Sequence, residues 1–173
     1  PKEYFSRLLG KEMPQRLSPL RDKMRLISKI HPHIKGVNVR RFNSEFAAIA
    51  AQSFIDEVLI RQLNVKYLLI GDDFCFGSKR QGNFALLKQQ QAFVTENTSS
   101  IMVENTRASS TVIREALSRG DLDLAERLLG HPYVLSGHVK HGAKLGRTLG
   151  CPTANVHLPP LLFPLNGVYV VEV

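Results

Sequence analysis

Apolar positions in the first part of the chain recur at helical spacing in several stretches. Leucine, isoleucine and methionine side chains lie three or four residues apart over residues 17–30, with Pro19 near the start and Pro32 beyond the end. This spacing predicts a helix. A longer amphipathic helix is predicted to begin at Ser44 as its cap, with a buried face of Phe46, Ala50, Phe54, Val58 and Leu59. Further helices are predicted over residues 83–93, 110–119 and 121–129.

Three short runs between these helices have the composition of strands, at residues 37–41, 65–70 and 100–103. Residues 65–70 are almost continuously apolar and end at Gly71, as expected of a strand buried on both faces of a parallel sheet. Because strands and helices alternate, the pattern predicts a doubly wound α/β sheet.

The composition of the sequence changes after Tyr133. Residues 133–173 are rich in glycine and valine, contain four prolines and show no helical period, so we predict the opening of an all-β domain. The boundary is placed near residues 130–132, which gives domains of 1–130 and 131–173. Since the chain opens at Pro1 without a methionine and closes on the β-rich run 168–173, we expect further sequence on both sides.

Composition and charge narrow the class of protein. The chain is 43% hydrophobic and 22% charged, and it has no apolar run of membrane-spanning length and no basic-then-apolar leader, so we expect a cytoplasmic protein without a membrane partner. Its net charge of +8 suits a polyanionic partner. Nucleic acid and a nucleoside triphosphate are both candidates. With no tryptophan and no stacking platform, the charge alone favours no polymer, and it also fits simple solubility. Cys75 and Cys151 are expected to be separate reduced thiols, and no metal is expected at the histidine pairs.

The first candidate site is residues 71–77, GDDFCFG, directly after the apolar strand. Ligands bind at this carboxyl edge of open α/β sheets. Phe74 and Phe76 fit a planar ring between them, Asp72 or Asp73 offers an acceptor for a ring N–H, and Gly77 permits a sharp turn. The same residues also fit an ordinary loop whose aromatic side chains enter the core.

The second candidate site opens the helix at residues 110–119. Ser109, Ser110 and Thr111 bring three hydroxyls to its N-terminus, and Arg114 lies one turn into the helix. Backbone N–H groups and the helix dipole favour anions there, so the group suits a phosphate cradle. A plain N-cap with a solvent-facing arginine is the alternative.

The third candidate site spans residues 137–155, GHVKHGAKLGRTLGCPTAN. Glycines that include Gly142 and Gly146 permit close approach to a phosphate chain, and Lys144 supplies positive charge. Thr153 and Asn155 are oxygen ligands two positions apart, which on an extended chain face the same side and suit Mg²⁺–nucleotide. The spacing differs from a P-loop because no lysine follows the second glycine and no helix follows.

Taken together, these three motifs resemble the prokaryotic bifunctional riboflavin kinase/FMN adenylyltransferase family, and the resemblance extends over essentially all 173 residues. Residues 146–155 are similar to its GRxLGxPTAN kinase signature, 71–77 to its GxDFxFG flavin loop and 109–114 to the SSTxIR element of nucleotidyltransferases. The resemblance implies a Rossmann-like adenylyltransferase domain, lacking its N-terminal part, followed by the start of an antiparallel β-barrel riboflavin kinase domain.

The family's two reactions are implied with their substrates. Riboflavin would be phosphorylated by ATP to FMN, and FMN adenylylated by ATP to FAD with release of pyrophosphate, both with Mg²⁺. The resemblance implies ATP binding in the first domain by Ser109, Ser110, Thr111 and Arg114, and flavin binding by Asp73, Phe74, Phe76 and Gly77. In the kinase it implies ATP binding by Gly142, Lys144, Gly146, Thr153 and Asn155, of which Thr153 and Asn155 hold the metal. Arg114 and Asn155 are the expected catalytic residues.

Two family elements are not found within the 173 residues: the HxGH motif and the kinase's catalytic glutamate. We therefore expect this segment in isolation to make neither FMN nor FAD. A nucleotidyltransferase for another mononucleotide, a non-catalytic flavin-binding module and a nucleic-acid-binding protein are the alternatives. The first leaves Thr153 and Asn155 unexplained, and the last is motivated only by charge.

Overall fold

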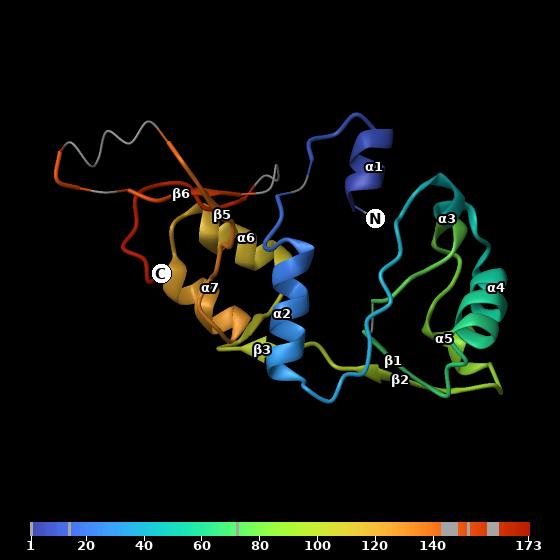
Figure 1. Ribbon diagram of the computed structural model, residues 1–173. Coiled ribbons are helices and arrows are strands. Elements are labelled where there is room, and N and C mark those ends of the chain that lie inside the picture. The colour runs from blue at the N-terminus through green and yellow to red at the C-terminus, as the bar shows by residue number, and fades with distance from the viewer. Residues whose placement is uncertain (1, 14, 72, 143–148, 152, 159–162) are drawn as a thin grey trace. The chain divides into compact units, whose positions relative to one another are not determined.

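The computed structural model describes residues 2–13, 15–71, 73–142, 149–151, 153–158 and 163–173 (Figure 1). Its contacts divide the chain into two compact units. One comprises Asn38–Arg107, and the other Lys2–Val37 together with Ala108–Val173. None of the helices in the described ranges is long and apolar enough to cross a membrane.

A parallel pair of strands forms the base of the unit 38–107. Strands β1 (Tyr67–Gly71) and β2 (Val94–Thr98) run parallel with Tyr67 opposite Val94. The connection between them contains η2 (Ser78–Arg80) and α5 (Phe84–Lys88). This is a parallel crossover built through a short helix, the repeating unit of α/β folds.

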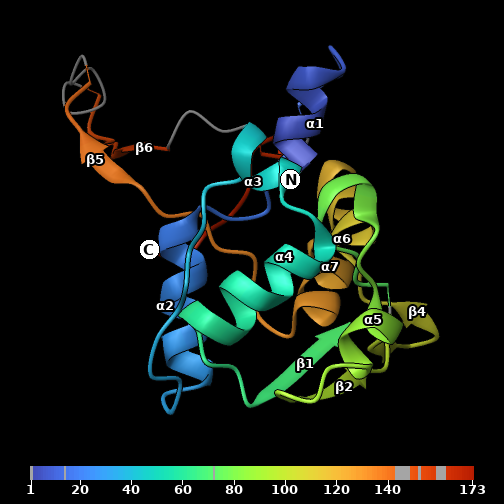
Figure 2. The same ribbon diagram turned by 90° about the vertical axis from the view of Figure 1, so that its right-hand side faces the viewer.

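Helices α3 (Ser44–Ala48), α4 (Ala51–Ser53) and the π-helix η1 (Phe54–Gln62) precede β1. Figure 2 shows α4 and α5 above the same side of the strand pair. The core there is formed by Ala51, Ile55, Leu59, Phe76, Leu87 and Phe93, against which Leu68 and Ile70 of β1 pack. The Thr95 hydroxyl of β2 donates to the Leu87 carbonyl at 3.3 Å on this covered face.

The strand predicted over residues 65–70 is found as β1, which begins only at Tyr67, and the prediction that it is buried on both faces is wrong within the described residues. Tyr67 and Leu69 alternate with the inward Leu68 and Ile70, and each is 54% exposed. Side chains alternate across a strand, and the described helices cover only one face. The apolar composition therefore reflects a covered face and an open one.

The long helix predicted from Ser44 is interrupted. Asn43, rather than Ser44, caps α3 by accepting from the Phe46 N–H at 2.9 Å. The backbone is extended at Ile49 and Ala50, and the Ile49 carbonyl accepts a hydrogen bond from the Ser78 N–H at 2.7 Å. A residue distant in sequence thus provides the hydrogen-bond partner of the Ile49 carbonyl at the break between the two helices. Ala50, predicted to be buried, is exposed.

Two of the predicted strands are also corrected. Residues 37–41 form no strand because no described segment forms a ladder with them, and a strand requires a paired partner. Residues 100–103 contain only β3 (Met102–Val103), which forms a small antiparallel hairpin with β4 (Thr106–Arg107). The predicted helix 83–93 shortens to α5, and the strand that follows it, β2, was not predicted.

Among its described residues, the second unit contains four helices: α1 (Lys2–Leu8), α2 (Leu20–Ile30), α6 (Ser110–Ser118) and α7 (Leu122–Leu129). The predictions for α2, α6 and α7 are confirmed. Asp121 caps α7 by accepting from the Leu124 N–H at 3.0 Å, and Gly130 ends it at φ +74°. Only glycine adopts this left-handed conformation without strain.

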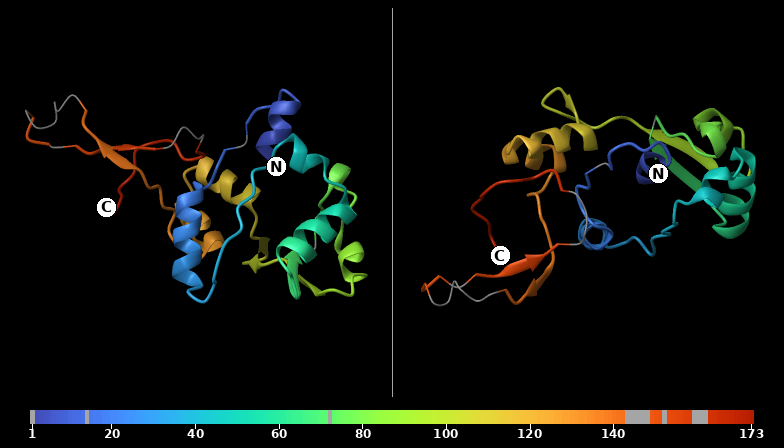
Figure 3. Two further views of the ribbon diagram at one scale, coloured as in Figure 1. Left: turned by 45° about the vertical axis from the view of Figure 1, so that its right-hand side comes forward. Right: turned by 90° about the horizontal axis from the view of Figure 1, so that it is seen from above.

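The described residues after α7 contain no further helix. Strands β5 (His138–Lys140) and β6 (Asn155–His157) pair antiparallel with His138 opposite His157, and Figure 3 shows them as a two-stranded ribbon. This agrees with an antiparallel domain, while the barrel remains a prediction. Residues 168–173 form no strand, since no described segment pairs with them.

Candidate functional site

The loop that follows β1 is packed tightly onto the helices before it. Gly77 has φ +72°, and a Cβ on Gly77 would lie 2.6 Å from the Cα atom of Ala51. Phe76 and Gly82 exchange two backbone hydrogen bonds, of 3.0 and 2.9 Å. Because a Cβ on Gly82 would lie 2.5 Å from the Phe76 ring, glycine is required for that ring to fit.

Phenylalanine rings form a continuous series beneath this loop. Phe76 is only 8% exposed, and its centroid lies 5.4 Å from that of Phe54 and 5.6 Å from that of Phe74. Phe74 stacks on Phe76 at an interplanar angle of 19° and is 38% exposed. Phe76 is thus a core residue, and Phe74 is the ring of the pair that a ligand can reach.

The acidic position of the loop is open to solvent. The Asp73 side chain is 79% exposed, and its Oδ2 atom lies 3.5 Å from Nη2 of Arg107. Such an exposed pair contributes little to stability, so the carboxylate remains accessible to a ligand N–H. Asp72, the other acidic candidate, lies outside the described residues.

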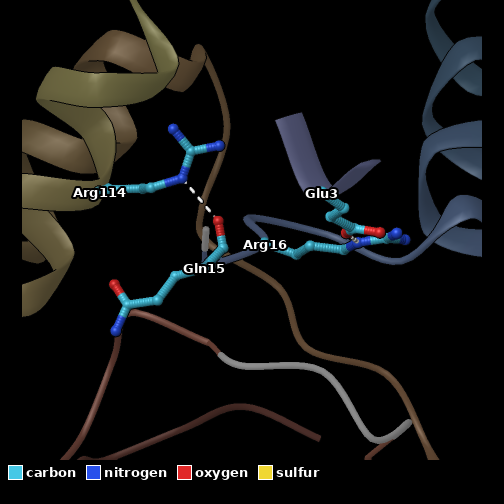
Figure 4. A network of polar contacts seen from close by, with 4 residues as sticks. All are labelled: Glu3, Gln15, Arg16 and Arg114. Carbon is cyan, nitrogen blue, oxygen red and sulfur yellow. Dashed lines mark hydrogen bonds and ion pairs between the residues drawn. The ribbon is translucent and has the colours of Figure 1, made fainter. Parts of the chain in front are cut away.

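The N-terminus of α6 brings together the four residues predicted for a phosphate cradle. Ser109 is the N-cap and accepts from the Val112 N–H at 3.3 Å. Ser110 and Thr111 are exposed in the first turn, where helix N–H groups have no partner within the helix. Arg114 is half-buried; its Nε donates to the Gln15 carbonyl at 2.6 Å and its Nη1 to the Ser110 carbonyl at 2.9 Å (Figure 4).

The third candidate site is described in part. Asn155 is the first residue of β6 and lies opposite Lys140. A Cβ on Gly142 would lie 2.3 Å from the Asn155 Nδ2 atom, so the amide occupies the space that this glycine leaves. Thr153 is exposed and precedes the strand, and Lys144 and Gly146 lie outside the described residues.

Sequence reasoning missed the environment of Arg114. Gln15, 99 residues away in the sequence, contacts Arg114 through its backbone carbonyl. Because every residue has a backbone carbonyl, the side chain at position 15 gives no sign of this contact. The next residue, Arg16, pairs with Glu3 of α1 through Nε and Oε1. That hydrogen bond is the main reason why the pKa of Glu3 lies below its usual value and that of Arg16 above.

Two protein-family models match the chain. Residues 1–112 match the FAD synthetase family model, and residues 129–173 match the riboflavin kinase model. The first match covers well over half of the chain, which therefore belongs to the FAD synthetase family.

Curated relatives carry both activities in their names. The chain is 49% identical to the bifunctional riboflavin kinase/FMN adenylyltransferase of Haemophilus influenzae, over 100% of this chain and 56% of that protein. It is 45% identical to that of Escherichia coli K12, over 92% of this chain and 51% of that protein. The chain thus spans about half the length of these relatives.

A solved structure resembles the chain as well. It is named a macrolide-efflux protein from Streptococcus pneumoniae and is 31% identical, with a TM-score of 0.74 over 88% of this chain and 49% of that one. The likeness extends over most of the present fold.

Proposed function

We propose that the protein carrying this chain makes both flavin nucleotides. It phosphorylates riboflavin with ATP to give FMN, then adenylylates FMN with a second ATP to give FAD and pyrophosphate. The supporting observation is the union, in one chain, of a FAD synthetase match at 1–112 and a riboflavin kinase match at 129–173. The parallel β1–β2 pair would then belong to a Rossmann-like sheet, and β5–β6 to the kinase barrel, with the boundary at residues 130–131.

The adenylyltransferase step is assigned to the N-terminus of α6. Attack of an FMN phosphate oxygen on the α-phosphorus of ATP expels pyrophosphate, so negative charge builds on the leaving phosphates. Ser110 and Thr111 offer hydroxyls and backbone N–H groups in the first turn, at the positive end of the helix, and Arg114 offers a fixed cation. Oriented donors of this kind stabilise the developing charge.

The flavin is assigned to the loop 71–77. The exposed face of Phe74 suits stacking of the isoalloxazine ring, and the Asp73 carboxylate suits acceptance of its N–H. Phe76 supports Phe74 from below at 5.6 Å. Gly77 allows the turn that would present Asp73 and Phe74 to the flavin.

The kinase step is assigned to the β5–β6 segment. Asn155 and Thr153 provide neutral oxygen ligands, a donor set that fits Mg²⁺ held mainly by ATP phosphates and water. When bound, the ion neutralises phosphate charge during transfer of the γ-phosphoryl group to the riboflavin 5′-hydroxyl. Gly142 leaves room for the Asn155 amide, while Lys144 and Gly146 are proposed to contact the phosphate chain.

Separate substitutions test the two sites in the full-length protein. Asn155→Ala is expected to abolish FMN formation from riboflavin while FAD formation from added FMN persists, and Arg114→Ala to do the reverse. Products are separated by HPLC, with Asn166→Ala and Arg119→Ala as matched exposed controls. If either site substitution removes both activities from folded protein, the assignment of separate sites is wrong.

A further inference from the structure

Arg114 is oriented by a segment that lies far from it in sequence. Of the five N–H donors of an arginine, one contacts the Ser110 carbonyl within α6 and another contacts the Gln15 carbonyl. The first contact comes with the helix itself. The second contact forms only if the chain near residue 15 is held in the right place. With both contacts made, the guanidinium still has further N–H donors for a phosphate.

The chain near residue 15 is held by α1. Arg16 turns its side chain to Glu3, and the two side chains are 38% and 31% exposed. Figure 4 shows Arg114 reaching the Gln15 carbonyl on one side of this segment and the Arg16 side chain extending to Glu3 on the other. Glu3 therefore contacts Arg16, Arg16 is bonded to Gln15 along the backbone, and Gln15 contacts Arg114.

We infer that Glu3 and Arg16 are positioning residues for Arg114 in adenylyl transfer. Neither bonds to the Arg114 guanidinium; both act by fixing the Gln15 carbonyl to which its Nε donates. The inference rests on the proposed role of Arg114 as a ligand of the ATP phosphates. Misplacement of a charge-stabilising group by about 1 Å can lower a rate by about 100-fold, so even a weak surface pair affects activity if it sets such a position.

Steady-state kinetics of the full-length protein test this inference. Glu3→Gln and Arg16→Gln are each expected to raise the KM for ATP in FAD formation and to lower kcat/KM on the order of 10-fold. The KM for FMN and the phosphorylation of riboflavin stay unchanged. Arg16→Lys, which keeps the charge, recovers most of the loss. Glu12→Gln removes an exposed carboxylate from the same segment and is the matched control.

A double-mutant cycle distinguishes positioning from a general structural effect. In an Arg114→Lys background, Glu3→Gln is expected to lower kcat/KM little further, because coupled residues are non-additive. Fully additive losses, or a fall in all activities at unchanged KM for ATP, would overturn the positioning role.

The same assays separate this inference from the proposed function. If Arg114→Lys impairs FAD formation while Glu3→Gln and Arg16→Gln match Glu12→Gln, the proposed function stands and the positioning role is wrong. If the unsubstituted protein does not adenylylate FMN, the proposed function fails and the inference with it.

Discussion

Replacement of Gly77 by alanine tests whether the turn after β1 is held by packing. The new Cβ would lie 2.6 Å from Cα, 2.7 Å from N and 2.9 Å from Cβ of Ala51, whereas carbon atoms in contact normally lie about 3.5–4.0 Å apart. Since two of these atoms are backbone, relief requires the loop or α4 to move by about 1 Å. Overpacking of this kind typically costs about 1–3 kcal/mol. The positive φ adds about 1–2 kcal/mol for an L-residue.

We therefore expect Gly77→Ala to lower the free energy of unfolding by about 2–5 kcal/mol. Thermal unfolding followed by circular dichroism measures this, and the lower bound corresponds to a fall in Tm of about 8 °C for a small domain. Gly71→Ala is the matched control in the same loop, because among the described residues its Cβ would meet Asp73 Oδ1 alone, at 3.5 Å, which is an ordinary contact. Equal stability of the two variants would refute the packing argument.

Substitutions at Tyr133 and Gly142 give the remaining predictions. Burial raises the pKa of Tyr133 to about 12. Its buried hydroxyl has no hydrogen-bond partner among the described residues. Because no hydrogen bond is lost when this hydroxyl is removed, Tyr133→Phe should leave the free energy of unfolding unchanged or raise it by up to about 1 kcal/mol. The phenol ionises near pH 10 in the unfolded chain and near pH 12 in the folded chain. The free energy of unfolding should therefore decrease as the pH rises from 10 to 12, and it should decrease less steeply in Tyr133→Phe. Identical pH profiles of the two proteins in chemical denaturation would contradict this. Gly142→Ala should displace the Asn155 amide, whose Nδ2 lies 2.3 Å from the added Cβ, and reduce FMN formation while FAD formation from FMN persists; an unchanged kinase rate would show that the amide position is unimportant.

Local sequence signals predicted the elements whose ends are determined locally. Helix α7 has a capping aspartate at one end and a left-handed glycine at the other, and both interactions lie within four residues. Residues 37–41 and 168–173 have strand composition but form no strand, because a strand also needs a neighbour. Strand β2 was missed for the converse reason: its residues VTENT are mostly polar, and pairing with β1 makes them a strand.

The candidate sites divide in the same way. The grouping at α6 was predictable because Ser109, Ser110, Thr111 and Arg114 fall within two turns of one helix. The direction of the Arg114 guanidinium was not, since it depends on a carbonyl contributed by Gln15. Likewise, the sequence predicted that a planar ring binds between Phe74 and Phe76, whereas the contacts of Phe76 with Phe54 and Gly82 make Phe76 a core residue.

Gly77 was interpreted as permitting a sharp turn, and Gly142 as allowing close approach of a phosphate chain. The structure adds a packing reason at both, and also at Gly82: Gly77 makes room for the backbone of Ala51, Gly82 for the Phe76 ring and Gly142 for the Asn155 amide. In the last two cases the space freed by the glycine is filled by a side chain of the motif itself. Such glycines orient the motif's functional groups before any ligand arrives, and this explains how Phe76 in its loop and Asn155 at the start of β6 are held in defined positions.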